Sequence, residues 1–149
     1  MRNILFLIFG LIILGCSKQS DKKDVWVSMN YMGNVDSLAE LVKKGDSIAF
    51  DKLEIGTWDY LDGASILPYA FLMADKYHYS RAYYSVFFNL IAPHFAGGVI
   101  VDSINIIPVE TKRLAIQYLK KGVYAGNSES ISSWNTLIEK KLINPNDYK

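Results

Sequence analysis

The chain has few cysteine and histidine residues. Its 149 residues include one cysteine and two histidines. A single cysteine cannot form an intramolecular disulfide, and a structural zinc site needs about four ligands. The histidines, His78 and His94, have no HExxH pattern and no cysteine beside them. We therefore expect neither a disulfide framework nor a metal site.

The sequence also lacks the short motifs of common enzymes. It has no P-loop, no G-x-G-x-x-G and no G-x-S-x-G. One pair of carboxylates, Asp59 and Asp62, lies in WDYLDG, whose aspartates and glycine are typical of a turn. Ser80 lies close to His78 in sequence but is predicted to cap a helix rather than to act as a nucleophile. We therefore expect no enzymatic activity and no cofactor.

Charge of one sign is not in excess. The chain has 16 Lys and Arg residues and 15 Asp and Glu residues, which gives a formal net charge of +1. No basic field therefore indicates nucleic-acid binding. Half of the residues are hydrophobic and 13% are aromatic, which is typical of a well-packed globular domain.

An apolar run long enough to span a membrane is absent as well. Residues 1–3 carry one positive charge, and 4–14 are apolar apart from Gly10. This run is much shorter than the roughly 20 residues of a transmembrane helix. A charged start, a short apolar run and a small residue, Gly15, are the parts of a secretory signal peptide.

The lone cysteine directly follows this run. Ile13-Leu14-Gly15-Cys16 resembles the lipobox of bacterial lipoproteins, although Leu14 stands where a smaller residue is commoner. The resemblance implies that residues 1–15 are a signal peptide, that the peptidase cleaves before Cys16, and that acyl chains such as palmitate anchor the protein to a membrane. The alternatives are an ordinary signal peptide with an incidental cysteine, or a buried N-terminal helix.

Residues 16–24 show no apolar periodicity and are predicted to be a solvated tether. The domain would then span 25–149, with Trp26 either in its first ordered contact or at the membrane interface. Ser17 after the cysteine permits outer-membrane sorting under the rule of enteric lipoproteins. We favour the periplasmic face of the outer membrane or the cell surface, with the inner membrane as the alternative.

Apolar residues recur at helical spacing through the rest of the chain. Asp46, Ser80 and Asn127 are predicted caps, and Pro108 opens a helix. The short links make successive helices antiparallel neighbours. We predict an all-α fold of three stacked hairpins, an α-solenoid, with helices over 35–44, 47–56, 65–76, 81–92, 108–121 and 129–142.

The links of the three hairpins align with one another. VKKGDSIAF, ADKYHYSRAY and VYAGNSESI place Gly45, His78 and Gly126 at one position. Gly45 and His78 lie 33 residues apart, close to the 34-residue period of helix–turn–helix repeats. His78 and Gly126 lie 48 apart, and an insertion over 94–107, predicted to be a loop with a short extended piece, accounts for the difference.

The third hairpin carries a more specific pattern. AIQYLKKG over 115–122, followed by Ala-Gly-Asn over 125–127, resembles a Sel1-like repeat, a relative of the tetratricopeptide repeat. Gly122 and Ser130 stand where that family usually has alanine, and the middle hairpin lacks the turn glycine. The resemblance implies a stacked array of hairpins whose concave face binds a protein or peptide.

Aromatic residues are concentrated between 69 and 88. One interpretation is core packing between the hairpins. The other is a binding surface, because Tyr79 and Tyr83 are four residues apart and can form one exposed patch. Tyr83 and Tyr84 point about 100° apart on a helix, so both cannot be central in the core. Tyr79, Tyr83 and Tyr84 are therefore the candidate protein-binding residues.

Together these patterns predict a membrane-anchored envelope lipoprotein. Its helical-repeat domain would bind a protein partner, as a scaffold, assembly factor, or inhibitor of the immunity type. The alternatives are an envelope enzyme or glycan-binding lipoprotein with an aromatic cleft, and a domain whose aromatic residues serve packing alone.

Overall fold

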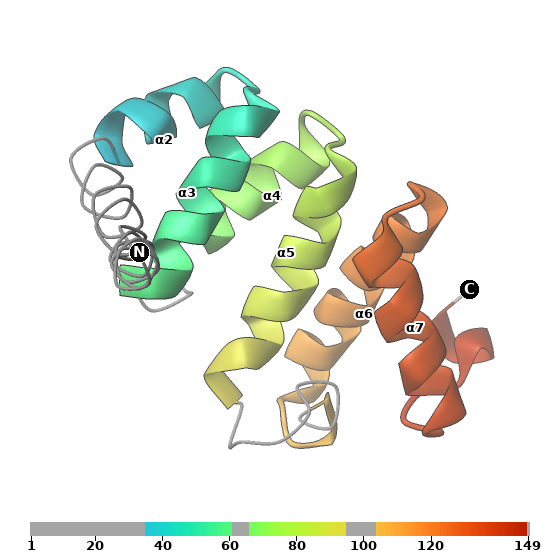
Figure 1. The fold of residues 1–149 in the computed structure, drawn as a ribbon. Coiled ribbons are helices and arrows are strands. Elements are labelled where there is room, and N and C mark those ends of the chain that lie inside the picture. The colour runs from blue at the N-terminus through green and yellow to red at the C-terminus, as the bar shows by residue number, and fades with distance from the viewer. Residues whose placement is uncertain (1–34, 61–65, 95–103, 149) are drawn as a thin grey trace, which may run out of the picture. The chain divides into compact units, whose positions relative to one another are not determined.

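The computed structural model describes residues 35–60, 66–94 and 104–148, and these are largely helical (Figure 1). They contain six α-helices and no strand, which confirms the predicted all-α class. The predicted signal peptide, Cys16, the tether and Trp26 lie outside the described residues. So do Gly97, Gly98 and the extended piece predicted within the insertion.

The six helices form three consecutive pairs. Within each pair the helices pack on one another, as the short links predict. The first pair is α2 (Val35–Lys43) and α3 (Ser47–Tyr60), the second is α4 (Leu67–Asp75) and α5 (Ser80–Ile91), and the third is α6 (Val109–Tyr124) and α7 (Ser128–Glu139). Short 3-10 helices, η2 (Ala92–His94) and η4 (Pro145–Tyr148), follow α5 and α7.

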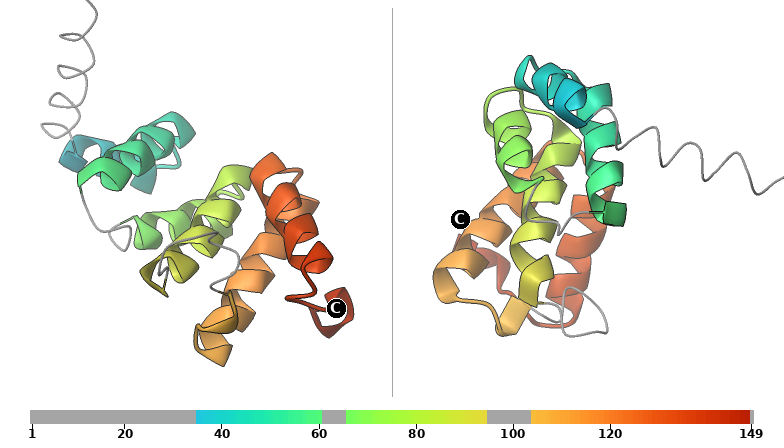
Figure 2. Two further views of the ribbon diagram at one scale, coloured as in Figure 1. Left: turned by 60° about the horizontal axis from the view of Figure 1, so that its bottom comes forward. Right: turned by 90° about the vertical axis from the view of Figure 1, so that its left-hand side faces the viewer.

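Contacts between the pairs centre on α4 and α5. Helix α4 packs against α2 and α3, while α5 packs against α6 and α7. Figure 2 shows α5 beside α6 from two further directions. Stacking of the hairpins into a solenoid stays a prediction.

Three predicted helix ends were wrong by three or four residues. Helix α6 continues to Tyr124 rather than ending at residue 121. Helix α3 continues to Tyr60 and so includes Asp59, which the sequence placed in a turn. A single aspartate costs a helix little, so it does not force the helix to stop. Helix α7 ends at Glu139 rather than at residue 142, because Lys141 takes a left-handed φ of 56°. The sequence has no glycine at this position to indicate such a turn.

The aligned link residues share one backbone conformation. Gly45, His78 and Gly126 have φ values of 91°, 53° and 74°. These values lie in the left-handed region, which glycine enters freely and which histidine enters more often than most residues. The alignment of His78 with the two glycines is therefore confirmed in the backbone.

The middle turn is one residue longer than the other two. In the first and third, the N–H after the glycine donates to the carbonyl five residues earlier, a Schellman-type ending. In the middle turn the equivalent N–H reaches back six residues. The bonds join Asp46 to Leu41 (3.2 Å), Asn127 to Gly122 (3.0 Å) and Tyr79 to Met73 (3.0 Å).

Two of the three predicted caps are confirmed. Asp46 Oδ1 accepts from the N–H of Ala49 at 2.9 Å, and Asn127 Oδ1 accepts from that of Ser130 at 2.8 Å. The prediction for Ser80 was wrong. In all three turns the N-cap directly follows the left-handed residue, so Tyr79 is the N-cap, without a side-chain capping bond, and Ser80 is the first residue of α5.

The core has two parts that share α5. Val86 of α5 is buried with Phe50 and Met73, and the neighbouring Phe87 is buried with Leu119 and Leu137. Each such side chain contributes about 1.5–3 kcal/mol when it is fully buried. The end of the insertion also belongs to the second part, since Ile104 and Ile107 are buried there rather than in a loop on the surface.

The two departures from the Sel1-like pattern meet in space. A Cβ on Gly122 would lie 2.2 Å from Ser130 Oγ and 2.8 Å from Ser130 Cβ. Gly122 therefore makes room for Ser130 where α6 and α7 cross. The Ser130 hydroxyl is buried and finds no hydrogen-bond partner among the described residues.

Ser130→Ala is expected to stabilise the domain by about 1 kcal/mol, because it removes a buried hydroxyl that has no partner. Urea unfolding of wild type and variant measures the difference. Ser132→Ala, at an exposed position of the same helix, corrects for the higher helix propensity of alanine. Equal effects of the two substitutions would show that the buried hydroxyl carries no penalty.

Candidate functional site

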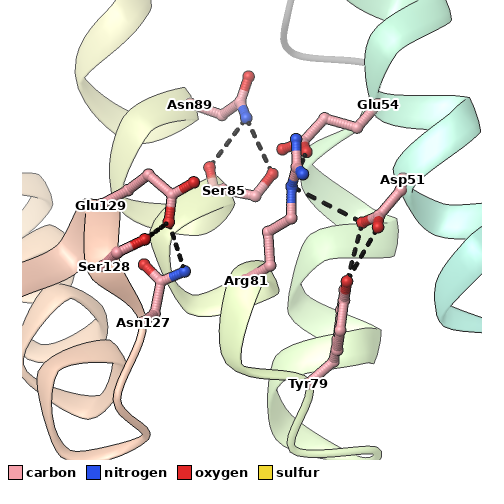
Figure 3. A network of polar contacts seen from close by, with 9 residues as sticks. All are labelled: Asp51, Glu54, Tyr79, Arg81, Ser85, Asn89, Asn127, Ser128 and Glu129. Atoms are coloured by element: carbon pink, nitrogen blue, oxygen red, sulfur yellow. Dashed lines mark hydrogen bonds and ion pairs between the residues drawn. The ribbon is translucent and has the colours of Figure 1, made fainter.

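Helices α3, α5 and α7 bring nine polar residues together, which we call the polar network (Figure 3). Those from α3 lie on one side of α5, and those from the start of α7 lie on the other. The network comprises Asp51, Glu54, Tyr79, Arg81, Ser85, Asn89, Asn127, Ser128 and Glu129.

Tyr79 joins the start of α5 to α3. Its hydroxyl donates to both carboxylate oxygens of Asp51, each at 3.0 Å. Its ring meets Phe50 edge-on, with 6.0 Å between centroids. Burial, and then the hydrogen bond to Asp51, raise the pKa of Tyr79 to about 12. The phenol is therefore a stable donor near neutral pH.

Arg81 is the cation of the network. Its Nε donates to Glu54 Oε2 at 3.0 Å and lies 3.6 Å from Asp51 Oδ1. Burial is the largest single influence and would lower the pKa of Arg81, but the charge and hydrogen bond of Glu54, together with the charge of Asp51, more than offset it, and the pKa is raised. The Glu54 side chain is only 8% exposed, whereas that of Arg81 is 42% exposed. Arg81 therefore pairs with a buried carboxylate while it still reaches solvent.

The start of α7 supplies a third carboxylate. Glu129 Oε2 accepts from Asn127 Nδ2 at 2.8 Å and from Ser128 Oγ at 2.9 Å. The pKa of Glu129 is lowered, first by its own backbone N–H at the helix start, and also by these side chains and the charge of Arg81. Arg81 thus lies between carboxylates from two different hairpins.

Two further polar residues lie deeper on α5. Asn89 Nδ2 donates to the Ser85 carbonyl at 2.8 Å and to its Oγ at 3.4 Å. Both side chains are buried, and with Arg81 they recur every four residues along one side of the helix. This polar stripe within an apolar helix was visible in the sequence, but sequence reasoning looked only at the aromatic residues.

The candidate tyrosines lie in different surroundings. Tyr79 is half-buried in the polar network, but Tyr83 is only 8% exposed. Tyr83 lies within hydrogen-bond distance of His78, with its hydroxyl 3.3 Å from Nδ1, and its ring packs near Tyr118. The expected exposed patch of Tyr79 and Tyr83 is therefore wrong. Because Gly122 has no side chain, the backbone of α5 approaches α6 closely there and Tyr83 enters the core.

Tyr84 of α5 is half-buried beside α7. Its ring lies 6.0 Å from that of Phe87 and 6.1 Å from that of Phe88. Its hydroxyl is hydrogen-bonded to Ser133, and burial raises its pKa. Tyr84 thus contributes part of its surface beside the polar network, and its role in binding stays a prediction.

Exposed apolar side chains adjoin the network. Ile48 and Ile55 of α3 are 67% and 50% exposed, and they stand three residues before and four after Asp51. This spacing places them on the same side of the helix as Asp51. Ile131 of α7, four residues beyond Asn127 and three beyond Ser128, is 39% exposed on their side of the helix. The network is thus a charged centre with apolar neighbours on both hairpins.

The polar network presents charged groups to solvent, since Arg81 and Glu129 are partly or fully exposed. Its three carboxylates and single guanidinium supply mainly acceptors and negative charge. In the described part of the chain, no three His, Cys, Asp or Glu residues converge closely enough to hold a metal ion. Among the same residues, no helix combines the length and hydrophobicity needed to cross a bilayer.

Comparisons of the chain with models of protein families, with curated proteins and with solved structures found no match. The resemblances to the lipobox and to the Sel1-like repeat therefore rest on the motifs of this chain alone.

Proposed function

We propose that the protein is a lipid-anchored lipoprotein of the bacterial envelope whose helical hairpins bind a protein partner. The observation that supports the binding role best is the polar network, a partly exposed group of charges with isoleucines beside it on α3 and α7. Protein interfaces combine apolar contact area with polar groups in this way. A scaffold, an assembly factor and an inhibitor would all use such a surface.

The repeat character supports the same proposal. The three turns place Gly45, His78 and Gly126 in one left-handed conformation, and two of them share the same hydrogen-bond pattern. Repeated hairpins that stack give extended surfaces, which repeat proteins use for binding. In this proposal α3, α5 and α7, the second helices of the three hairpins, present the binding surface.

The anchor is tested at Cys16. Cys16→Ser is expected to abolish incorporation of labelled palmitate and to leave the signal peptide uncleaved, because the acylated thiol is the proposed anchor. Metabolic labelling and a mass shift on gels measure both effects. A Cys16→Ser protein that is still labelled and still fractionates with membrane lipid would contradict the lipobox prediction.

The binding surface is tested by photo-crosslinking in membranes of the native host. A photoreactive amino acid replaces Ile48 or Ile131 beside the network, or Val109 on α6 as an exposed apolar control. We expect the same host protein to be crosslinked from Ile48 and Ile131, and not from Val109.

Glu129→Lys then probes the charge of the network. Glu129 is exposed, so the variant should fold, whereas replacing the buried Tyr83 would disturb the core. We expect at least a fivefold loss of crosslinking from Ile131, since losing one charge-assisted contact costs about 1 kcal/mol or more. Equal crosslinking from Val109, or none from any position, would contradict the proposal and favour a glycan-binding or packing role.

A further inference from the structure

The link between α4 and α5 contacts the α2–α3 hairpin at successive points. The first contact is made by Tyr77. Its hydroxyl donates to the Lys43 carbonyl at 2.7 Å, where α2 ends. Its ring lies so close to Gly45 that an added Cβ would come within 2.5 Å of a ring carbon. Tyr77 therefore covers the turn between α2 and α3.

Two more contacts follow on alternate residues. Tyr79 bonds to Asp51, and Arg81 pairs with Glu54, both on α3 and nearly one turn apart. Tyr79 has extended backbone, with φ of −72° and ψ of 117°. The intervening His78 is left-handed and Arg81 lies in the first turn of α5, yet the side chains at 77, 79 and 81 all reach the same hairpin. We call Tyr77, Tyr79 and Arg81 the latch.

Among the described residues, the α2–α3 hairpin is otherwise supported by its share of the core, where Val42, Phe50 and Leu53 are buried with residues of α4 and α5. Its main other contacts are to α4, whereas α5 packs against α4, α6 and α7. The latch contacts are mostly polar and partly open to solvent, so water can replace them when they break. A hairpin at one end of a domain can open locally at a lower free energy than global unfolding, since only its own contacts have to break.

We infer that the α2–α3 hairpin is a movable arm, held by the latch, that opens as a unit while α4 to α7 remain folded. Opening exposes apolar side chains that the hairpin covers, among them Phe50 and Met73, which are buried together in the closed state. The arm therefore controls how much apolar surface the domain presents. This inference does not depend on the proposed partner or on the lipid anchor.

Hydrogen–deuterium exchange with mass spectrometry, on the full-length protein in detergent, tests the arm. Tyr79→Phe removes the hydroxyl and keeps the ring on Phe50. We expect amides of α2 and α3 to exchange about tenfold faster, and those of α6 and α7 to change less than twofold. Tyr77→Phe should act in the same direction, because it removes the bond to the Lys43 carbonyl. Its ring would still cover Gly45.

Tyr118→Phe is the matched control. It removes the same kind of bond, from a tyrosine hydroxyl to Asp75, between α6 and α4. We expect it to leave exchange in α2 and α3 within twofold of wild type. If Tyr79→Phe accelerates α6 and α7 as much as α2 and α3, the hairpin does not open separately. If it leaves α2 and α3 unchanged, Tyr79 is not a latch residue.

Discussion

Gly122→Ala is expected to destabilise the domain by about 1–2 kcal/mol. The new methyl group would overlap Ser130 and would also lie 3.2 Å from Tyr83 Cβ, so α5, α6 and α7 all limit its space. Overpacking of this kind in a core usually costs about 1–3 kcal/mol. The gain in helix propensity from glycine to alanine, about 1 kcal/mol, offsets only part of the cost of overpacking. It would offset that cost fully only if the helices moved apart and relieved the overlap. Urea unfolding of both proteins measures the loss.

Two further variants make this prediction specific. Ser130→Gly removes both atoms that the methyl group would strike, so the double variant should recover about 1–2 kcal/mol relative to the sum of the single effects. Gly56→Ala on α3 is the matched control, since an added Cβ there has no neighbour within 4 Å. A Gly122→Ala protein as stable as Gly56→Ala would show that α6 and α7 adjust without cost.

Gly45→Ala is expected to cost about 1.5–3.5 kcal/mol, for two reasons that add. At a φ of 91° an L-residue is strained by about 1–2 kcal/mol. The methyl group also displaces the Tyr77 ring, and the bond from Tyr77 to the Lys43 carbonyl, worth about 0.5–1.5 kcal/mol, is lost with it. Thermal unfolding followed by circular dichroism detects a change of this size.

Gly126→Ala separates the two causes. Gly126 also has a positive φ, 74°, but an added Cβ there meets nothing within 4 Å. We expect it to cost only the backbone strain, about 1–2 kcal/mol. Similar losses for both variants would mean that Tyr77 moves away freely, and would weaken its place in the latch.

Local features were the part of the fold that the sequence could predict. Asp46 and Asn127 cap their helices because a short polar side chain reaches the next turn whatever lies elsewhere in the chain. The aligned positions of Gly45 and Gly126 follow from the same local geometry. Ser80 was wrong because the N-cap directly follows the left-handed residue in all three turns, and in the middle turn that position is Tyr79.

The candidate site depended on contacts distant in sequence. Arg81 and Glu54 are both visible as charges, but their pairing requires the rotation and crossing of α3 and α5. Tyr79 was selected for its ring, and its hydroxyl bond to Asp51 was not foreseen. Gly122 and Ser130 were noted separately as departures from a motif. Only the packing of α6 on α7 shows that each explains the other.

The order of helix contacts has a consequence for how the chain folds. Every major contact joins helices that are neighbours or next neighbours along the chain. Such local topology has a low contact order, and helical domains of this kind typically fold in microseconds to milliseconds. Each hairpin can form soon after its second helix is complete and then dock on the one before it. A chain that emerges from its N-terminus can therefore assemble this domain in sequence, without waiting for its last helix.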